Sequence, residues 1–157
     1  MILTPIYVSL LILINSEDYH PIKCNVTEYS FTFIHTGQEP LVHGLWPEKC
    51  SECIECGYPT CCNMVKFANF TIPTETQFID RYWFGGQSPH PGNVCDLSTS
   101  TLFEHEVLKH GSCMGMFSTD YLNLVEYLFH KYYEYIHTVC QSKKECSFYL
   151  NGDFSLK

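Results

Sequence analysis

Basic side chains are scarce in this 157-residue sequence, which has nine lysines and arginines against 17 aspartates and glutamates. Arg81 is the single arginine, and the formal net charge is −8 at pH 7. This balance excludes a protein that binds nucleic acid through a broad basic surface. It still allows an enzyme that holds one phosphate in a local pocket. The eight histidines would move the net charge toward zero as the pH falls toward about 5.

The sequence also lacks an apolar run long enough to cross a membrane, which takes about 20 residues. Ile6–Ile14 is a stretch of nine uncharged, mostly apolar residues, and its length fits the core of a secretory signal peptide. A buried first strand is the alternative interpretation. We expect residues 1–16 to be a signal peptide whose removal leaves residues 17–157 as a single domain without a membrane span.

Repeats and low-complexity tracts are absent, but cysteine is abundant, with ten residues in the chain. An even and high number of cysteines indicates a disulfide-bonded protein of an oxidising compartment, secreted or lumenal. Five of them fall in residues 48–62, which we expect to be a loop ordered by cross-links. A second loop is predicted over the glycine- and proline-rich residues 85–93. Asn25 and Asn69 each begin a possible glycosylation acceptor triplet, which fits a protein of the secretory pathway.

Alternating hydrophobic residues predict strands near both ends of the domain. Tyr29–Ile34 is the clearest of them, and extended structure resumes over Leu41–Leu45. We expect this second strand to end at Trp46–Pro47, because the residue before a proline is restricted and the proline lacks an N–H. Phe148–Leu156 predicts a hairpin with a two-residue turn at Asn151–Gly152.

Two helices are predicted between these strands. The first begins near Thr101 and ends at residue 109 or 110, with Gly111 as its C-terminal stop. The second is capped by Ser118 or Thr119 and continues with helical periodicity to Ile136. We interpret its aromatic stripe as a core-packing face, formed by Phe129, Tyr132, Tyr133 and Tyr135. Together the elements predict an α+β domain in which an antiparallel sheet packs against helices.

Three histidines lie beside other residues that can do chemistry. His43 lies in the segment VHGLWP, and His105 and His110 lie on the first predicted helix. At 100° per residue, His105, His110, Glu106 and Lys109 share about 140° of the helix circumference. The simplest alternative is a solvated polar face, but such faces are usually built of lysine and glutamate rather than histidine. We therefore interpret this arc as functional.

Metal sites can be weighed from spacing. A zinc-binding helix needs histidines at i and i+4, whereas His105 and His110 stand at i and i+5 with Lys109 between them. An ammonium repels a dication, so we expect no metal and no cofactor on this helix. The run Cys50–Cys56, with a cysteine at every third position, has spacing closer to that of a zinc site. In an oxidising compartment these cysteines are more simply disulfides, and a cysteine-rich zinc module remains an alternative.

The arrangement suits phosphoryl transfer without metal. One imidazole can remove a proton from a nucleophile while another protonates the leaving oxygen, and nearby cations neutralise charge on the phosphorus oxygens. Two segments of the chain resemble the signature segments of the ribonuclease T2 family of secreted endoribonucleases. They are HGLWP at residues 43–47 and FEHEVLKHGSC at residues 103–113, in the family's order and separation.

This resemblance implies a role for each residue of the arc. His110 would be the general base for the ribose 2′-hydroxyl, and His43 the general acid that protonates the leaving 5′-oxygen. The product would be a 2′,3′-cyclic phosphate, which water then opens. His105 would hold the phosphate, Lys109 would stabilise the pentacovalent transition state, and Glu106 would orient its neighbours. DNA lacks the 2′-hydroxyl and should not be cut.

The resemblance also implies base-binding residues and shows departures from the family pattern. Trp46 would stack on a base, and Leu102 stands where the family often has an aromatic residue at that site. Val107 replaces a tryptophan, and on the helical wheel it faces the core. His35 and Thr36 replace a glutamine and a tryptophan of the family, which affects one base subsite.

Disulfide candidates follow from the same comparison. In the family the cysteine of the KHGSC segment commonly pairs with one shortly after HGLWP, so Cys113 is expected to pair with Cys61 or Cys62. Cys140 and Cys146 are a candidate pair from their proximity in sequence. The remaining connectivity stays open.

We therefore expect a secreted or lumenal, acid-leaning, monomeric endoribonuclease that acts on single-stranded RNA without a cofactor. The alternative is a secreted module of the same fold with a binding, toxic or immunomodulatory role, in which RNA cleavage is incidental. Comparing His43→Ala and His110→Ala with the unaltered protein in a biological assay would separate the two.

Overall fold

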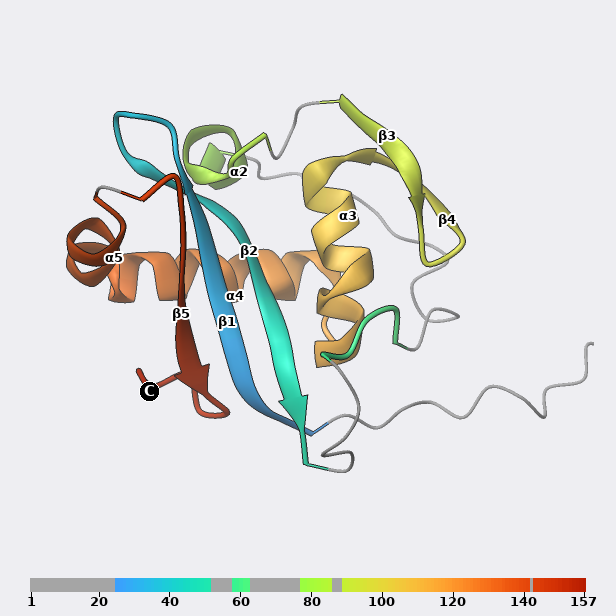
Figure 1. Ribbon diagram of the computed structural model, residues 1–157. Coiled ribbons are helices and arrows are strands. Elements are labelled where there is room, and N and C mark those ends of the chain that lie inside the picture. Colours follow the sequence, from blue (N-terminus) through green and yellow to red (C-terminus); the bar gives the residue numbers. More distant parts are fainter. Residues whose placement is uncertain (1–24, 52–57, 63–76, 86–88, 142) are drawn as a thin grey trace, which may run out of the picture.

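The computed structural model describes residues 25–51, 58–62, 77–85, 89–141 and 143–157 (Figure 1). The expected signal peptide and Asn69 lie outside the described residues, as do Cys53 and Cys56 of the possible zinc motif. Asn25 lies at an exposed position just before the first strand. No helix in the described part of the chain is long and apolar enough to cross a membrane.

The central feature is a three-stranded antiparallel sheet in the order β2-β1-β5. Its strands are β1 (Val26–His35), β2 (Pro40–Cys50) and β5 (Glu145–Asn151). The strand predicted over residues 29–34 is confirmed as the middle of β1. Within the sheet, Phe31 lies opposite Leu45 of β2 and Phe148 of β5, and this apolar row faces the core.

The prediction that the second strand ends at Trp46–Pro47 is wrong, because β2 continues to Cys50. Pro47 lies opposite Tyr29 in the ladder. β2 is an edge strand, and an edge strand tolerates a proline because the missing N–H can lie on the side without a neighbouring strand. The extension also takes the first residues of the expected 48–62 loop into the sheet.

Helices α4 (Ser118–Lys131) and α5 (Tyr133–Cys140) pack against one face of the sheet, with α4 running behind β1 and β2 (Figure 1). Sequence periodicity predicted one helix here, but Tyr132 (φ −109°, ψ 16°) ends α4 and begins α5. The aromatic stripe is divided by this break. Phe129 and Tyr132 are buried in the core, whereas the prediction is wrong for Tyr133 and Tyr135, which are 38% and 40% exposed.

The second group of elements lies beside the edge strand β2 (Figure 1). It contains α2 (Gln77–Tyr82), the hairpin β3 (Pro89–Val94) and β4 (Leu97–Thr101), α3 (Leu102–Lys109) and the short 3-10 helix η1 (Gly111–Met114). The hairpin strand β3 occupies part of the loop expected over residues 85–93.

The helix predicted from Thr101 is confirmed as α3. Thr101 caps it in a capping box: the Thr101 hydroxyl accepts from the Glu104 N–H, and the Glu104 carboxylate accepts from the Thr101 N–H. α3 ends at Lys109, as predicted, but the chain continues at Gly111 in the 3-10 helix η1 instead of turning away there. The reversal comes at Gly115, which has the left-handed φ of 68°.

The C-terminal hairpin has a longer turn than predicted. Asn151 N–H donates to the Ser155 carbonyl and Phe154 N–H donates to the Asn151 carbonyl, so three residues connect the two arms. The left-handed position is Phe154 (φ 61°) rather than Gly152. A three-residue loop of this kind needs one such position at its end, and here it falls on Phe154.

Two disulfides join the cysteine-rich segment to the elements beside β2. Cys62 pairs with Cys113 of η1, and Cys61 pairs with Cys95 in the turn between β3 and β4. Cys61 is therefore not the partner of Cys113. Cys140 pairs with Cys146 and connects the end of α5 to β5. None of the cysteines that the structure describes is a free thiol.

Candidate active site

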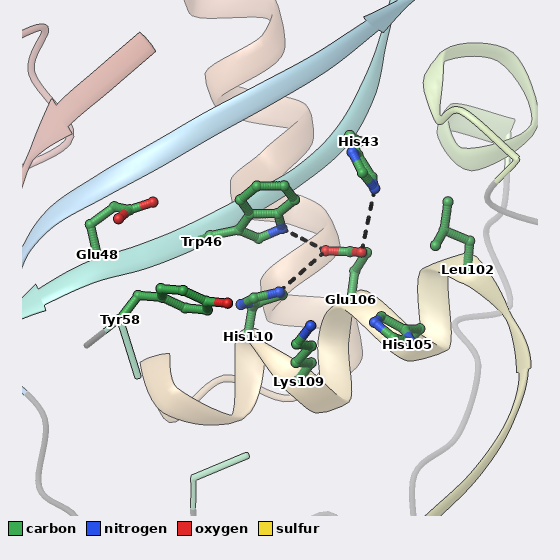
Figure 2. A pocket seen from close by; sticks show the side chains of 9 residues that line it. All are labelled: His43, Trp46, Glu48, Tyr58, Leu102, His105, Glu106, Lys109 and His110. Carbon is green, nitrogen blue, oxygen red and sulfur yellow. Dashed lines mark hydrogen bonds and ion pairs between the residues drawn. The ribbon is translucent and has the colours of Figure 1, made fainter. Parts of the chain in front are cut away.

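His43 occupies a β-bulge in β2. Thr32 of β1 pairs with Gly44 and Phe33 pairs with Val42, so His43 is the extra residue between them. Val42 is buried in the core, whereas the His43 side chain is 26% exposed. A bulge re-aims a side chain that strict alternation would direct elsewhere, and here it directs His43 toward α3 (Figure 2).

Helix α3 supplies the facing residues. Phe103 and Val107 enter the core, and Val107 is fully buried there as the helical wheel predicted. The other side of α3 presents Glu106, Lys109, His105 and the C-cap residue His110 toward β2 (Figure 2).

The Glu106 carboxylate lies at the meeting point of the two segments (Figure 2). Its Oε1 is 3.8 Å from His43 Nε2 and its Oε2 is 3.9 Å from His110 Nε2. Trp46 donates its indole N–H to Glu106 Oε2 over 2.6 Å. One buried carboxylate thus contacts two histidines that lie far apart in the sequence.

The Trp46 ring contacts both imidazoles. Its centroid is 5.2 Å from that of His110 in a stacked arrangement, with an interplanar angle of 29°. It is also 5.2 Å from His43, edge to face. The resemblance assigned Trp46 to base stacking, but in the structure it also contacts both histidines and their shared carboxylate.

These residues line one cavity of about 520 Å³. Every site residue expected from the sequence borders it, and the full lining is His43, Trp46, Glu48, Tyr58, Leu102, His105, Glu106, Lys109 and His110. Glu48 and Tyr58 were not anticipated. Glu48 could have been found, because it directly follows the HGLWP segment. Tyr58 has no comparable signal in the sequence.

Backbone contacts of the neighbouring cysteines bring Tyr58 to the cavity. Cys61 N–H donates to the Lys109 carbonyl over 2.8 Å, and Cys62 N–H donates to the Ser112 hydroxyl over 3.1 Å. With the Cys62–Cys113 disulfide, these bonds fix residues 58–62 against the end of α3. Tyr58 is 58% exposed at the mouth of the cavity and can offer a ring to a bound ligand.

Burial changes the proton affinities of the central groups. It raises the pKa of Glu106 to about 7, although the Trp46 hydrogen bond and the Lys109 charge act in the opposite direction. The pKa of His110 is lowered to about 3, mainly by burial and additionally by the charges of Lys109, His105 and His43. The pKa of His43 is also lowered, mainly by burial.

The second ring nitrogens of the two histidines have no hydrogen-bond partner within the described residues. His43 Nδ1 and His110 Nδ1 are both buried in this state. The 3.8 and 3.9 Å approaches to Glu106 are longer than hydrogen bonds. The ring positions therefore depend on packing and on the backbone that carries them.

The described residues contain no group of three or more histidine, cysteine or acidic side chains arranged to hold a metal ion. Lys109 borders the same cavity as the two histidines, and its ammonium would repel a dication. His35 lies outside this site and borders a separate cavity of about 240 Å³ together with His137.

Residues 12–151 match the Ribonuclease T2 family, and the chain belongs to that family. The RNase-related protein from Calystegia sepium has a similar fold, with a TM-score of 0.57 over 83% of this chain and 89% of that chain. The two sequences are 14% identical, so this likeness concerns the fold alone. A comparison with curated proteins finds no match.

Proposed function

We propose that this member of the ribonuclease T2 family is a secreted endoribonuclease that cleaves single-stranded RNA by transphosphorylation. The observation that supports it most strongly is the approach of His43 and His110, from separate segments, to the single carboxylate of Glu106. Acid–base cleavage of a phosphodiester needs two proton-transfer groups on one cavity.

His110 is suited to be the general base. Its lowered pKa of about 3 keeps the imidazole neutral under almost all conditions, so it can accept the proton of the ribose 2′-hydroxyl. The 2′-oxygen then attacks phosphorus. His43, in its protonated form, gives a proton to the departing 5′-oxygen, and the P–O5′ bond breaks. The product is a 2′,3′-cyclic phosphate, which water opens with the two histidines in exchanged roles.

Charge on the phosphate is balanced by Lys109 and His105, which border the same cavity. Glu106 would repel the phosphate if it were ionised. Because burial raises its pKa to about 7, the carboxyl is largely protonated in mildly acidic solution and the repulsion is removed. An anionic substrate would in turn raise the pKa of His43 and favour the acid form that the reaction needs.

The remaining cavity residues fit a nucleobase. Trp46 and Tyr58 offer aromatic rings, and stacking of one base is worth about 1–3 kcal/mol. Leu102 and Glu48 complete the lining. The disulfides suit an oxidising compartment, and exposed Asn25 suits glycosylation there. We propose a monomer that acts outside the cell or in an acidic organelle after its signal peptide is removed.

Matched oligonucleotides test this function. A short RNA and the DNA of the same sequence would be incubated with the protein in excess chelator at mildly acidic pH. Only the RNA should be cleaved, because the 2′-hydroxyl is the nucleophile. Cleavage of the DNA, or cleavage only after a divalent metal is restored, would contradict the proposal.

A further inference from the structure

Side chains form hydrogen bonds with backbone N–H and C=O groups on the outer edge of β2, in the segment that carries His43 and Trp46. On its inner side β2 pairs with β1, and no strand of the described sheet lies on its other side. Unpaired backbone groups at a buried edge are costly, so they need other partners. Trp83 and Tyr121 provide them.

Tyr121 of α4 binds the middle of this segment. Its hydroxyl donates to the Leu45 carbonyl over 2.8 Å and accepts from the Leu45 N–H over 3.0 Å. The N–H and C=O of one strand residue point to the same edge, so a single hydroxyl can bond both. Tyr121 is completely buried, and water cannot replace it there.

Trp83 binds the same edge at the bulge. Its indole N–H donates to the His43 carbonyl over 3.0 Å, and the next residue, Phe84, donates its N–H to the Val42 carbonyl over 2.8 Å. The Trp83 ring also packs edge to face on Phe103 of α3, with centroids 5.1 Å apart. Trp83 thus joins the His43 backbone to the helix that carries the other site residues.

The Tyr121 ring contacts the second histidine segment as well. Gly111 directly follows His110, and a Cβ at Gly111 would lie 3.1 Å from Tyr121 Cδ2. The ring is therefore packed against the backbone at the end of α3 while its hydroxyl holds β2. One side chain bridges the two segments from the core side, opposite the cavity.

We propose that Tyr121, together with Trp83, is a positioning residue that fixes the His43 bulge and the Trp46 ring relative to His110. The inference rests on the proposed function. The His43 ring has no hydrogen bond of its own at Nδ1 within the described residues, so its position follows that of its backbone. Loss of the Tyr121 hydroxyl leaves the Leu45 N–H and C=O buried without a partner, and the segment must shift to satisfy them.

Tyr121→Phe tests this, because it keeps the packed ring and removes only the hydroxyl. Tyr132→Phe is the matched control: Tyr132 is also buried, and its hydroxyl donates to the Phe154 carbonyl over 2.5 Å without touching either histidine segment. NMR titration of the histidine imidazoles would be recorded for both variants and the unaltered protein, with His43→Ala and His110→Ala to assign the signals. kcat and KM on a dinucleotide would be measured in parallel.

In Tyr121→Phe we expect the His43 imidazole signals and their titration midpoint to move, and kcat to fall roughly 10- to 100-fold with KM little changed. Tyr132→Phe should leave the His43 signals, their titration midpoint and kcat unchanged, even if it lowers the melting temperature as much as Tyr121→Phe does. Unchanged His43 signals in a folded Tyr121→Phe protein would overturn the inference. If that variant does not fold, Trp83→Phe must move the His43 signals, and unchanged signals there would overturn it too. Because NMR needs no turnover, an inactive protein would count against the proposed function alone.

Discussion

Trp46 donates its indole N–H to Glu106 across the two histidine segments, with 2.6 Å between Nε1 and Oε2. This bond links the edge strand β2 directly to helix α3 inside the cavity. It also places the indole against both imidazoles, at 5.2 Å from each ring centroid. Trp46, Glu106, His43 and His110 therefore form one packed unit, and we expect a change to any of these side chains to displace the others.

Gly44 leaves the space that this unit occupies. A Cβ at Gly44 would lie 2.5 Å from Trp46 Nε1 and 2.6 Å from Glu106 Oε2, too close for either atom. We therefore expect Gly44→Ala to displace the indole and break its bond to the carboxylate. Cleavage should fall roughly 100-fold, and the tryptophan fluorescence spectrum should change, because Trp46 is one of only two tryptophans.

Gly92→Ala serves as the control for that substitution. Gly92 lies in the β3 strand, and a Cβ there would meet its nearest neighbour at 4.0 Å, an ordinary contact. Activity and fluorescence should be unchanged. If Gly44→Ala were as active as Gly92→Ala, the packed arrangement of Trp46 and Glu106 would not be needed for cleavage.

Glu106→Gln should stabilise the protein at pH 8. The Glu106 carboxyl has a pKa of about 7 in the folded protein, above the unfolded value of about 4.3. The folded state is therefore favoured most below about pH 4, where the carboxyl is protonated in both states, and this stability is lost as the pH rises through 7. Glutamine cannot ionise and avoids that loss. We expect a gain of about 1–3 kcal/mol in the free energy of unfolding at pH 8, and almost none at pH 4.

Urea unfolding at both pH values measures this difference. Because His110 is present in both proteins, its own protonation cancels when they are compared at one pH. Glu126→Gln, on the exposed face of α4, should change stability little at either pH. A Glu106→Gln protein that is less stable than the parent at pH 8 would show that the buried ionised carboxylate is favourable.

The pH profile of cyclisation should be bell-shaped and acidic. The general acid His43 must carry a proton, so activity declines as the pH rises through its pKa, which burial holds below the ordinary value of about 6.5. The general base His110 must be neutral, so activity declines as the pH falls toward about 3. We expect kcat/KM to be greatest between these limits. A rate that stays constant above pH 7 would be incompatible with these roles.

The Cys62–Cys113 disulfide should contribute more stability than Cys140–Cys146. The paired residues are 51 apart in the first case and 6 in the second, and chain-entropy arguments give about 4 and 2 kcal/mol respectively. Replacing both members of each pair by serine and measuring thermal unfolding tests the order. Loss of the first pair should also reduce cleavage, because Cys113 follows His110 closely and holds that end of α3. Equal losses of stability would contradict the expectation.

Much of the helical half of the site could be predicted from sequence. The rotation per residue of an α-helix alone put Glu106, Lys109 and the two histidines of α3 on one arc, and Thr101 marked where that helix begins. These are local properties, which neighbouring residues determine. The same is true of the central strand β1, whose alternating aromatic residues lie on the side that packs into the hydrophobic core.

The strand half of the site could not be predicted in this way. The bulge at His43 depends on how β2 aligns with β1, and alternation along β2 gives no sign of it. Pro47 predicted the end of this strand, but β2 continues past it. A proline is tolerated there because β2 lies at the edge of the sheet, and the position of a strand within a sheet is a tertiary property. Tyr58 reaches the cavity through contacts of the adjacent cysteines, and the approach of Trp46 to Glu106 depends on how α3 packs beside β2.

The most direct test of the central claim is to follow the products of His43→Ala and His110→Ala. RNA would be incubated in excess chelator with each variant and with the unaltered protein, and the ends formed would be separated to detect 2′,3′-cyclic phosphates. We expect the unaltered protein to form cyclic ends, and each folded variant to be slower by about 10²- to 10⁴-fold. Undiminished cyclic-phosphate formation by either variant, or RNA cleavage by the unaltered protein that leaves neither 2′,3′-cyclic phosphate nor 3′-phosphate ends, would contradict a mechanism based on these two imidazoles.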